Sequence, residues 1–311
     1  MQFKDGCLVI SLDLEMRWGV LESYKTFDEY KENILGVENA VSAMLDLFNK
    51  YKIHATWATV GGLMCKDYEE FNKFSPKKKP NYKKNILSPY ELDSLLYKKE
   101  EKQFFNPSIV QNILKVEGQE IASHTFSHLF LKEEGIVSED FLSDNISFSD
   151  ICEKYNIKNV NTIIFPRNQV FYIDELKKTN IKLYRGNQQE WYFNVGEKKL
   201  KRKFAKIFRF YDLHFSRKNR TVLPTKIDSV YNIPASVFLR PYDNDFLVSL
   251  RVKRIKNMMD RAKQDNRILH LWWHPHNFGV NLEKNLNMLE EIIKYSNKIG
   301  LNSKNMKECI L

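Results

Sequence analysis

Uninterrupted runs of apolar residues alternate along this chain with stretches whose apolar positions recur every three or four residues. Runs at 7–12, 162–165 and 268–273 are short and continuous. Such runs are typical of strands buried on both faces, as in a parallel sheet. Strand–helix repetition of this kind predicts an α/β fold with parallel pairing and right-handed crossovers. The helical spacing is found at Val41, Leu45 and Phe48, at Ile109, Ile113, Leu114 and Val116, and at Leu286, Leu289, Ile292 and Ile293.

A fourth, shorter apolar run precedes His124 at residues 120–122. Each of these four strands ends in residues that can take part in chemistry. In parallel α/β folds the carboxyl ends of strands meet at one edge of the sheet, where sites form. The convergence of acids, imidazoles and a guanidinium therefore predicts one site. The ordinary alternative is that the acids emerge into solvent and the histidines cap a strand. The end residues are Asp13 and Glu15, then His124, Arg167, and finally His274 with His276.

The segment from His124 to His128 carries two imidazoles four residues apart. In a helical turn these positions share a face, so both rings can reach one point. A borderline divalent ion binds imidazole nitrogen and commonly one carboxylate. Asp13 and Glu15 are two residues apart on a strand and point to the same side. Two histidines on one face are also common on polar surfaces.

Length and composition indicate a single enzyme domain spanning residues 1–311. The chain is 43% hydrophobic, which suffices for one core, and no internal repeat is visible. Its four cysteines are far apart and form no CxxC, so we expect reduced thiols. We find no leader peptide and no run of 18 apolar residues, and therefore expect a cytoplasmic location.

Several motifs resemble those of the carbohydrate esterase 4 family, the polysaccharide deacetylases that share the NodB homology domain. Residues 13–15 resemble its first motif, an acid cluster that ends the first strand. Residues 119–128 closely match the second, a strand leading into H-[ST]-x-x-H. Residues 165–167 resemble the third, and 268–274 the fifth. The sequence from Trp272 to Gly279 resembles a bacterial subgroup found with surface-polysaccharide biosynthesis.

The resemblance implies a distorted (β/α) barrel of the NodB type with insertions, which we expect at about 66–105 and 187–230. It departs from the family in two places. Many members have adjacent aspartates in the first motif, whereas Leu14 separates Asp13 from Glu15, so either acid could be the metal ligand. The fourth motif, an aspartate and tryptophan pair, has only loose candidates in Trp191 and Asp212.

The function implied is a metal-dependent N-deacetylase, a hydrolase acting on the N-acetyl group of an amino sugar in a surface-polysaccharide (O-antigen or capsule) intermediate. One divalent ion, expected to be Zn²⁺, would supply the nucleophile and polarise the carbonyl. Two alternatives are an inactive sugar-binding protein of the same fold and a metal-independent glycosidase. The expected roles are Glu15, His124 and His128 as metal ligands, Asp13 as base, Arg167 as its orienting partner, His274 as acid, and Trp273, His276 and Arg185 in substrate binding.

Positive charge is concentrated in residues 198–220. This window contains ten Lys or Arg and one acid, Asp212, while the whole chain has a net charge of +10. Apolar residues recur within it at helical spacing: Leu200, Phe204, Ile207, Phe208 and Tyr211. A basic helix with an apolar stripe fits an anionic membrane surface or anionic partner, and the alternative is an insertion packed on the barrel. We therefore expect a substrate on a nucleotide or lipid carrier, with peripheral contact at the inner membrane face. No zinc-finger spacing or RNP-like motif indicates nucleic acid.

Overall fold

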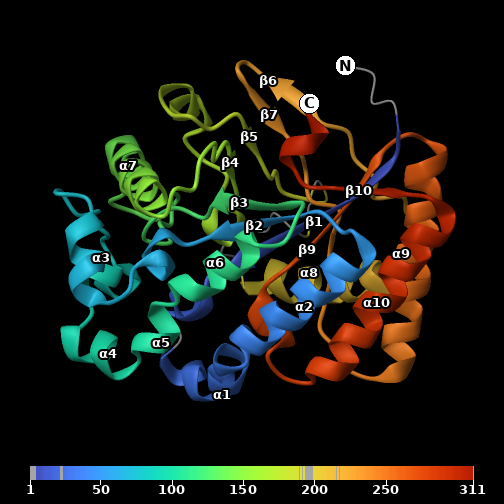
Figure 1. Ribbon diagram of the computed structural model, residues 1–311, viewed down its shortest axis with the longest axis horizontal. Coiled ribbons are helices and arrows are strands. Elements are labelled where there is room, and N and C mark those ends of the chain that lie inside the picture. Colours follow the sequence, from blue (N-terminus) through green and yellow to red (C-terminus); the bar gives the residue numbers. More distant parts are fainter. Residues whose placement is uncertain are drawn as a thin grey trace.

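The computed structural model describes residues 5–21, 24–188, 190, 192, 199–214, 216 and 218–310. Its centre is a curled sheet with the strand order β6-β7-β5-β4-β3-β2-β1-β9-β8, in which only the β6–β7 pair is antiparallel (Figure 1). β10 (Asn302–Lys304) pairs with the first half of β1. The other strands are β1 (Cys7–Leu14), β2 (Ala55–Thr59), β3 (Gln119–Ser123), β4 (Thr162–Ile163), β5 (Leu183–Tyr184), β6 (Thr225–Ile227), β7 (Val230–Asn232), β8 (Val237–Phe238) and β9 (Ile268–Trp273).

One extended segment, residues 230–239, closes the sheet into a barrel. Its first half pairs with β5, where Leu183 lies opposite Tyr231. Its second half pairs with β9, where Val237 lies opposite Leu271. The same segment therefore bridges both edges of the sheet. The expected distorted (β/α) barrel of the NodB type is confirmed, and two-residue ladders at β4, β5 and β8 are where it is irregular.

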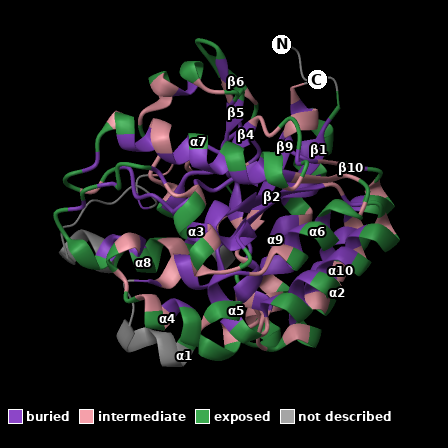
Figure 2. Cartoon of the chain, turned by 60° about the vertical axis from the view of Figure 1, so that its left-hand side comes forward, coloured by how far each residue is buried: buried purple, intermediate pink, exposed green. Residues whose placement is uncertain are grey.

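Helices cover the outside of the barrel, as the green exposed and purple buried faces show (Figure 2). The three helices expected from apolar spacing are present as α2, α6 and α10. Their apolar faces pack with the outward side chains of the strands into the largest core cluster. The helices are α1 (Tyr24–Leu35), α2 (Val37–Tyr51), α3 (Tyr68–Phe74), α4 (Ser94–Lys99), α5 (Glu101–Phe104), α6 (Pro107–Leu114), α7 (Ser138–Lys154), α8 (Lys199–His214), α9 (Asp245–Gln264) and α10 (Leu282–Ile299).

The two faces of β1 have different surroundings, because successive side chains of a strand point in opposite directions. Leu8, Ile10 and Leu12 belong to the outer core beneath the helices. Cys7 and Val9 belong to a separate apolar cluster inside the barrel. Ser11, Asp13 and Glu15 continue this inner row toward the carboxyl end of the strand. The period of two thus places both acids on the barrel interior.

The two expected insertions form ordered structure where they are described. Residues 66–105 form α3, α4 and α5, and their aromatic rings surround Trp18, with Phe71 at 5.0 Å and Phe104 at 5.5 Å between ring centroids. This segment therefore buries Trp18 under a cluster of aromatic side chains. In the second segment α8 is the helix predicted by the apolar stripe, whereas Trp191 lies outside the described residues. Within the described part of the chain, no helix is long and apolar enough to cross a membrane.

Candidate active site

The floor of the site is a chain of hydrogen bonds inside the barrel. His270, on β9, has its Nδ1 at 3.1 Å from the carbonyl oxygen of Pro234, which can only accept. Its Nε2 therefore accepts from the Ser11 hydroxyl at 2.9 Å, and that hydroxyl oxygen accepts from Arg185 at 3.0 Å. Burial, with Arg185 nearby, lowers the pKa of His270 to about 3. His270 and Ser11 are thus two hydrogen-bonded neutral groups on the inner face of the barrel.

Asp13 lies next in this inner row and forms an ion pair with Arg185. The guanidinium of Arg185 donates to both carboxylate oxygens at 2.7 Å, and its side chain is fully buried. Burial opposes ionisation of Asp13, but the charge of Arg185, followed by His124 and His274, outweighs it and lowers the pKa of Asp13. The bidentate pair fixes the plane of the carboxylate. Arg185, for which the sequence predicted substrate binding, is 1% exposed and pairs with Asp13.

Arg167, the residue expected to orient Asp13, lies elsewhere. It adopts a left-handed backbone conformation (φ 53°) just after Pro166, and its guanidinium carbon lies 3.8 Å from the centre of the Phe130 ring. One of its nitrogens is 3.5 Å from Glu133. The next residue, Asn168, points inward, and its side-chain oxygen accepts from Arg185 at 3.0 Å. Arg167 therefore does not hold Asp13; the third motif contributes to Asp13 through Asn168, which the sequence analysis missed.

Both histidines of the second motif contact the same carboxylate oxygen of Glu15. Its Oε2 is 3.3 Å from His124 Nε2 and 2.9 Å from His128 Nε2. Burial opposes ionisation, but the charge of His274 and the bonds with both histidines hold the pKa of Glu15 well below its usual range. Glu15 begins a sharp turn after β1, and a Cβ on Gly19 would collide with its carboxylate. Glycine at position 19 is therefore needed for this close approach, a second residue that the sequence analysis missed.

The segment between the two histidines is an irregular turn, although the sequence analysis expected a helical one. Thr125 and His128 have positive φ values of 61° and 57°, which no α-helix contains. Asp144, on α7, holds the turn: its carboxylate accepts from the backbone of Phe126 and Ser127 and from the Ser127 hydroxyl. The imidazoles still converge, with ring centroids 5.1 Å apart. No local signal marked Asp144, because it acts from a helix later in the chain.

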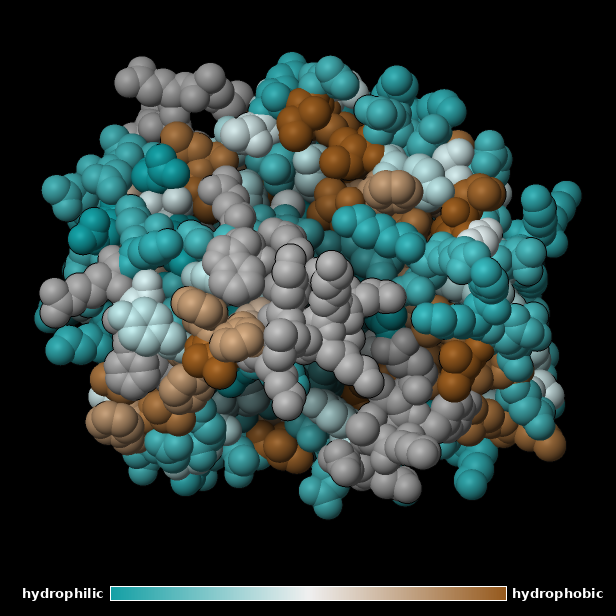
Figure 3. All heavy atoms as spheres, turned by 180° about the vertical axis from the view of Figure 1, so that it is seen from behind, coloured by the Kyte–Doolittle hydropathy of each residue, from teal (hydrophilic) through white to brown (hydrophobic). Residues whose placement is uncertain are grey.

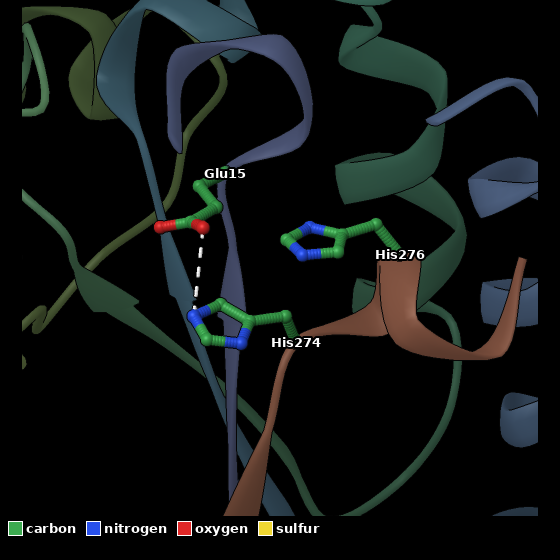
Figure 4. A group of neighbouring side chains, drawn as sticks. All are labelled: Glu15, His274 and His276. Carbon is green, nitrogen blue, oxygen red and sulfur yellow. Dashed lines mark ion pairs between the residues drawn. The ribbon is translucent and has the colours of Figure 1, made fainter. Parts of the chain in front are cut away.

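The end of β9 brings His274 to the same site. Its Nε2 lies 3.5 Å from Glu15 Oε1 and 3.9 Å from Asp13 Oδ2, and 22% of its side chain is exposed (Figure 4). By the period of two, Trp272 shares this inner face, with Arg185 4.3 Å from its ring centre. Trp273 points outward, fully buried and stacked on Phe278 at 5.7 Å. Trp273, for which the sequence predicted substrate binding, thus faces away from the acids, and Trp272 is the tryptophan on the inner face.

His276 follows in the short 3-10 helix η8 (Pro275–Phe278) and stacks on His274, with centroids 4.9 Å apart. It is 5% exposed, and one of its ring nitrogens lies within reach of Glu15 and His274. Burial lowers the pKa of His276 to about 4, so the ring is neutral. The sequence predicted that His276 binds substrate, but its buried position leaves little of the side chain accessible to a sugar.

The donor set of Glu15, His124 and His128 fits a divalent metal. His124 donates from Nδ1 to the carbonyl of Ile164 at 2.7 Å, which leaves the lone pair of Nε2 facing a carboxylate oxygen. Two acceptors facing each other need a cation or a proton between them. A ligating histidine characteristically donates its other ring nitrogen to a carbonyl in this way. The three ligand atoms lie within 4.8 Å of one another, as one metal ion requires.

Residues 22–163 match the family model described as polysaccharide deacetylase. The matched stretch includes His124 and His128, while Asp13, Glu15 and His274 lie outside it. A search of curated proteins gave no match. The family-model match covers slightly less than half of the chain and shows a similarity to polysaccharide deacetylases over that stretch.

Solved structures share the fold at low sequence identity. A protein described as a polysaccharide deacetylase from Mycobacterium smegmatis is 11% identical over 98% of this chain and 89% of its own, with a TM-score of 0.61. One from Pseudomonas aeruginosa PAO1 is 10% identical over 98% and 90%, with a TM-score of 0.58. A GH57-type branching enzyme from Pyrococcus horikoshii is 10% identical over 98% and 70%, with a TM-score of 0.57. The fold is therefore common to different carbohydrate-active enzymes, and the chemistry has to be argued from the site.

Proposed function

We propose that this protein is a metal-dependent N-deacetylase that hydrolyses the acetamido group of an amino sugar in a surface-polysaccharide intermediate. The observation that carries the proposal is the convergence of His124 and His128 on one oxygen of Glu15. A zinc ion held there by three protein ligands would lower the pKa of a bound water and polarise the acetyl carbonyl. The remaining chemistry belongs to side chains of the chain itself.

Asp13 is the group that we assign to take the proton from the attacking water. Arg185 keeps it ionised and fixes its plane, and its lone pairs not used by Arg185 remain open to the site. His274 is the group that we assign to protonate the departing amine. It is the more exposed of the site histidines, and it faces both acids. Amide hydrolysis needs one proton to leave the attacking water and one proton to reach the departing nitrogen. Asp13 would accept the first, and His274 would donate the second.

The glycosidase alternative fits the site less well. A glycosidase needs one carboxylic acid that is protonated to donate to the leaving oxygen. Here Asp13 is paired with Arg185, and Glu15 is surrounded by His124, His128 and His274, so both environments favour the ionised form. An inactive sugar-binding relative would be expected to have lost a ligand or the base, whereas every position is filled.

The direct test is release of acetate from N-acetylated nucleotide sugars and lipid-linked sugars by zinc-loaded protein. Asp13→Asn should retain zinc and lose turnover, whereas Glu15→Gln should lose zinc, because Oε2 is the oxygen that both histidines contact. Metal content after dialysis separates the two results. The reverse pattern would exchange the roles of the acids, and active wild-type protein without metal would end the proposal.

The exposed face of α8 favours a carrier at a membrane. Phe204, Ile207, Phe208 and Tyr211 lie on one helical stripe and are 53%, 65%, 46% and 58% exposed. The face beside this stripe is the packed one: Ala205 is buried, and Asp212 pairs with Arg220 at 2.7 Å and Arg254 at 3.3 Å. The apolar stripe is thus turned outward, and hydrophobic atoms gather on this side of the molecule, left of centre in Figure 3.

We infer that this stripe, within the basic window, rests on an anionic bilayer surface. Of the ten Lys or Arg in residues 198–220, Arg220 pairs with Asp212 and Arg209 donates to the Tyr192 carbonyl oxygen. The other eight would complement anionic lipid, and each contributes on the order of 1 kcal/mol near such a surface. A polyprenyl pyrophosphate carrier would present the sugar at this surface, whereas a nucleotide carrier would not need it. The four cysteines are free and buried, which suits a reducing cytoplasm and contact from its side of the inner membrane.

A further inference from the structure

The two carboxylate oxygens of Glu15 face different histidines. Oε2 contacts His124 and His128, as described above, while Oε1 lies 3.5 Å from His274 Nε2. Among the described residues, Glu15, His274 and His276 form a second group whose ligand atoms all lie within 4.8 Å of one another (Figure 4). Two imidazoles and a carboxylate are the same donor types that make up the first group.

His276 supplies an independent indication of a ligand. It is 5% exposed, and its Nδ1 has no hydrogen-bond partner among the described residues. An unsatisfied buried polar atom costs about 1–3 kcal/mol, and a bound cation would remove that cost. The ring extends from η8 toward Glu15, and Asn33 fixes this helix by donating to the His276 carbonyl oxygen at 2.9 Å. The nitrogen is therefore held in place without a partner in the protein.

We propose that Glu15, His274 and His276 form a second metal position, which takes Zn²⁺ or a similar borderline divalent ion. Glu15 would bridge the two positions, one oxygen to each. The second ion would bind roughly tenfold or more weakly, because it shares the one carboxylate and is repelled by the first ion. The ligand chemistry disfavours Mg²⁺ and Ca²⁺, which prefer oxygen.

Occupancy of the second position has a consequence that rests on the function proposed above. A metal ion on His274 Nε2 uses the lone pair that would otherwise carry the proton for the leaving amine. The doubly loaded protein should therefore be inactive, so that excess zinc inhibits what the first zinc activates. Activity plotted against free zinc should rise and then fall, with the falling limb governed by His276.

The test is zinc stoichiometry of the full-length, tag-free protein by equilibrium dialysis and native mass spectrometry. Wild type should bind two zinc ions of unequal affinity, and His276→Ala and His276→Gln should bind only the tighter one. His54→Ala is the matched control and should keep both, because His54 pairs with Glu308 at 2.8 Å, outside both groups. Circular dichroism confirms folding, and of the two His276 variants glutamine better preserves the size and polarity of the ring.

Each outcome decides the proposal. One zinc in wild type and one in both His276 variants overturns the second position but leaves the deacetylase proposal intact. No tightly bound zinc in wild type overturns both. If wild type binds two and the His276 variants also bind two, the second ion lies elsewhere and the assignment is wrong. Where a substrate is in hand, zinc inhibition that persists unchanged in His276→Gln overturns the inhibitory role.

Discussion

Replacing Arg185 with methionine removes the guanidinium that holds Asp13 and leaves a flexible chain of comparable length. Two bonds of 2.7 Å to Asp13, one of 3.0 Å to Ser11 and one of 3.0 Å to Asn168 are lost together. Arg185 is 1% exposed and Asp13 3%, so water cannot replace the lost donors without opening the barrel. Removing one partner of a buried ion pair costs about 3–5 kcal/mol. For a chain of this length, that corresponds to a fall in Tm of about 5–8 °C.

Arg167→Met is the matched control for this prediction. It removes the same chemical group from the residue that sequence reasoning assigned to Asp13, but its side chain is 28% exposed and its ion pair with Glu133 is 3.5 Å long. Such a partly exposed pair is worth about 1 kcal/mol or less. In the double variant Asp13→Asn/Arg185→Met, part of the loss should be recovered, because no buried carboxylate is left without a partner.

Urea unfolding followed by circular dichroism, on metal-free protein, gives the three free energies of unfolding. Turnover of the zinc-loaded protein should also fall about 10–100-fold in Arg185→Met, the usual effect of losing a group that positions a site residue. The reasoning is refuted if Arg185→Met unfolds within about 1 kcal/mol of wild type. It is equally refuted if Arg167→Met is the more damaging of the two.

Three further predictions address the acid, the floor of the site and α8. His274→Ala should lower turnover by roughly 10²–10⁴-fold and keep the first zinc, and loss of that zinc would make His274 a primary ligand instead. The folded-state pKa of His270 is about 3, below the unfolded value near 6.5, so as pH falls below 6.5 only the unfolded state gains this proton. Between pH 6 and pH 4 this group should therefore lower the free energy of unfolding of wild type by about 1.4 kcal/mol per pH unit. Urea titrations at several pH values should show a shallower dependence on pH in His270→Gln. An equal dependence in both proteins would contradict the assignment. The double variant Phe204→Ser/Phe208→Ser should bind phosphatidylserine vesicles more weakly than wild type at low salt. Leu95, exposed on α4, is the control position, and Leu95→Ser should bind like wild type. Equal binding by wild type and both variants would mean that the stripe does not contact the bilayer.

Local sequence fixed much of what is found at the ends of the strands. Asp13 and Glu15 share the barrel interior because a strand alternates its side chains with a period of two, whatever its neighbours. The same rule, counted back from His274, would have identified Trp272 instead of Trp273 as the tryptophan facing the site. That signal was present in the sequence and was not used.

Other features depended on contacts between distant segments. Arg167 and Arg185 both follow short strands, but only Arg185 reaches Asp13. Arg167 and Asn168 both have a left-handed backbone, and it is Asn168 that accepts from Arg185. Asp144 shapes the turn between the two histidines from a helix whose sequence shows no reason for it. On α8 the spacing identified the stripe, but its outward direction was set by ion pairs between Asp212 and distant arginines. The periodicity of a sequence predicts the face of a helix or strand on which a side chain lies. The residue that this side chain contacts depends on how the helices and strands pack together.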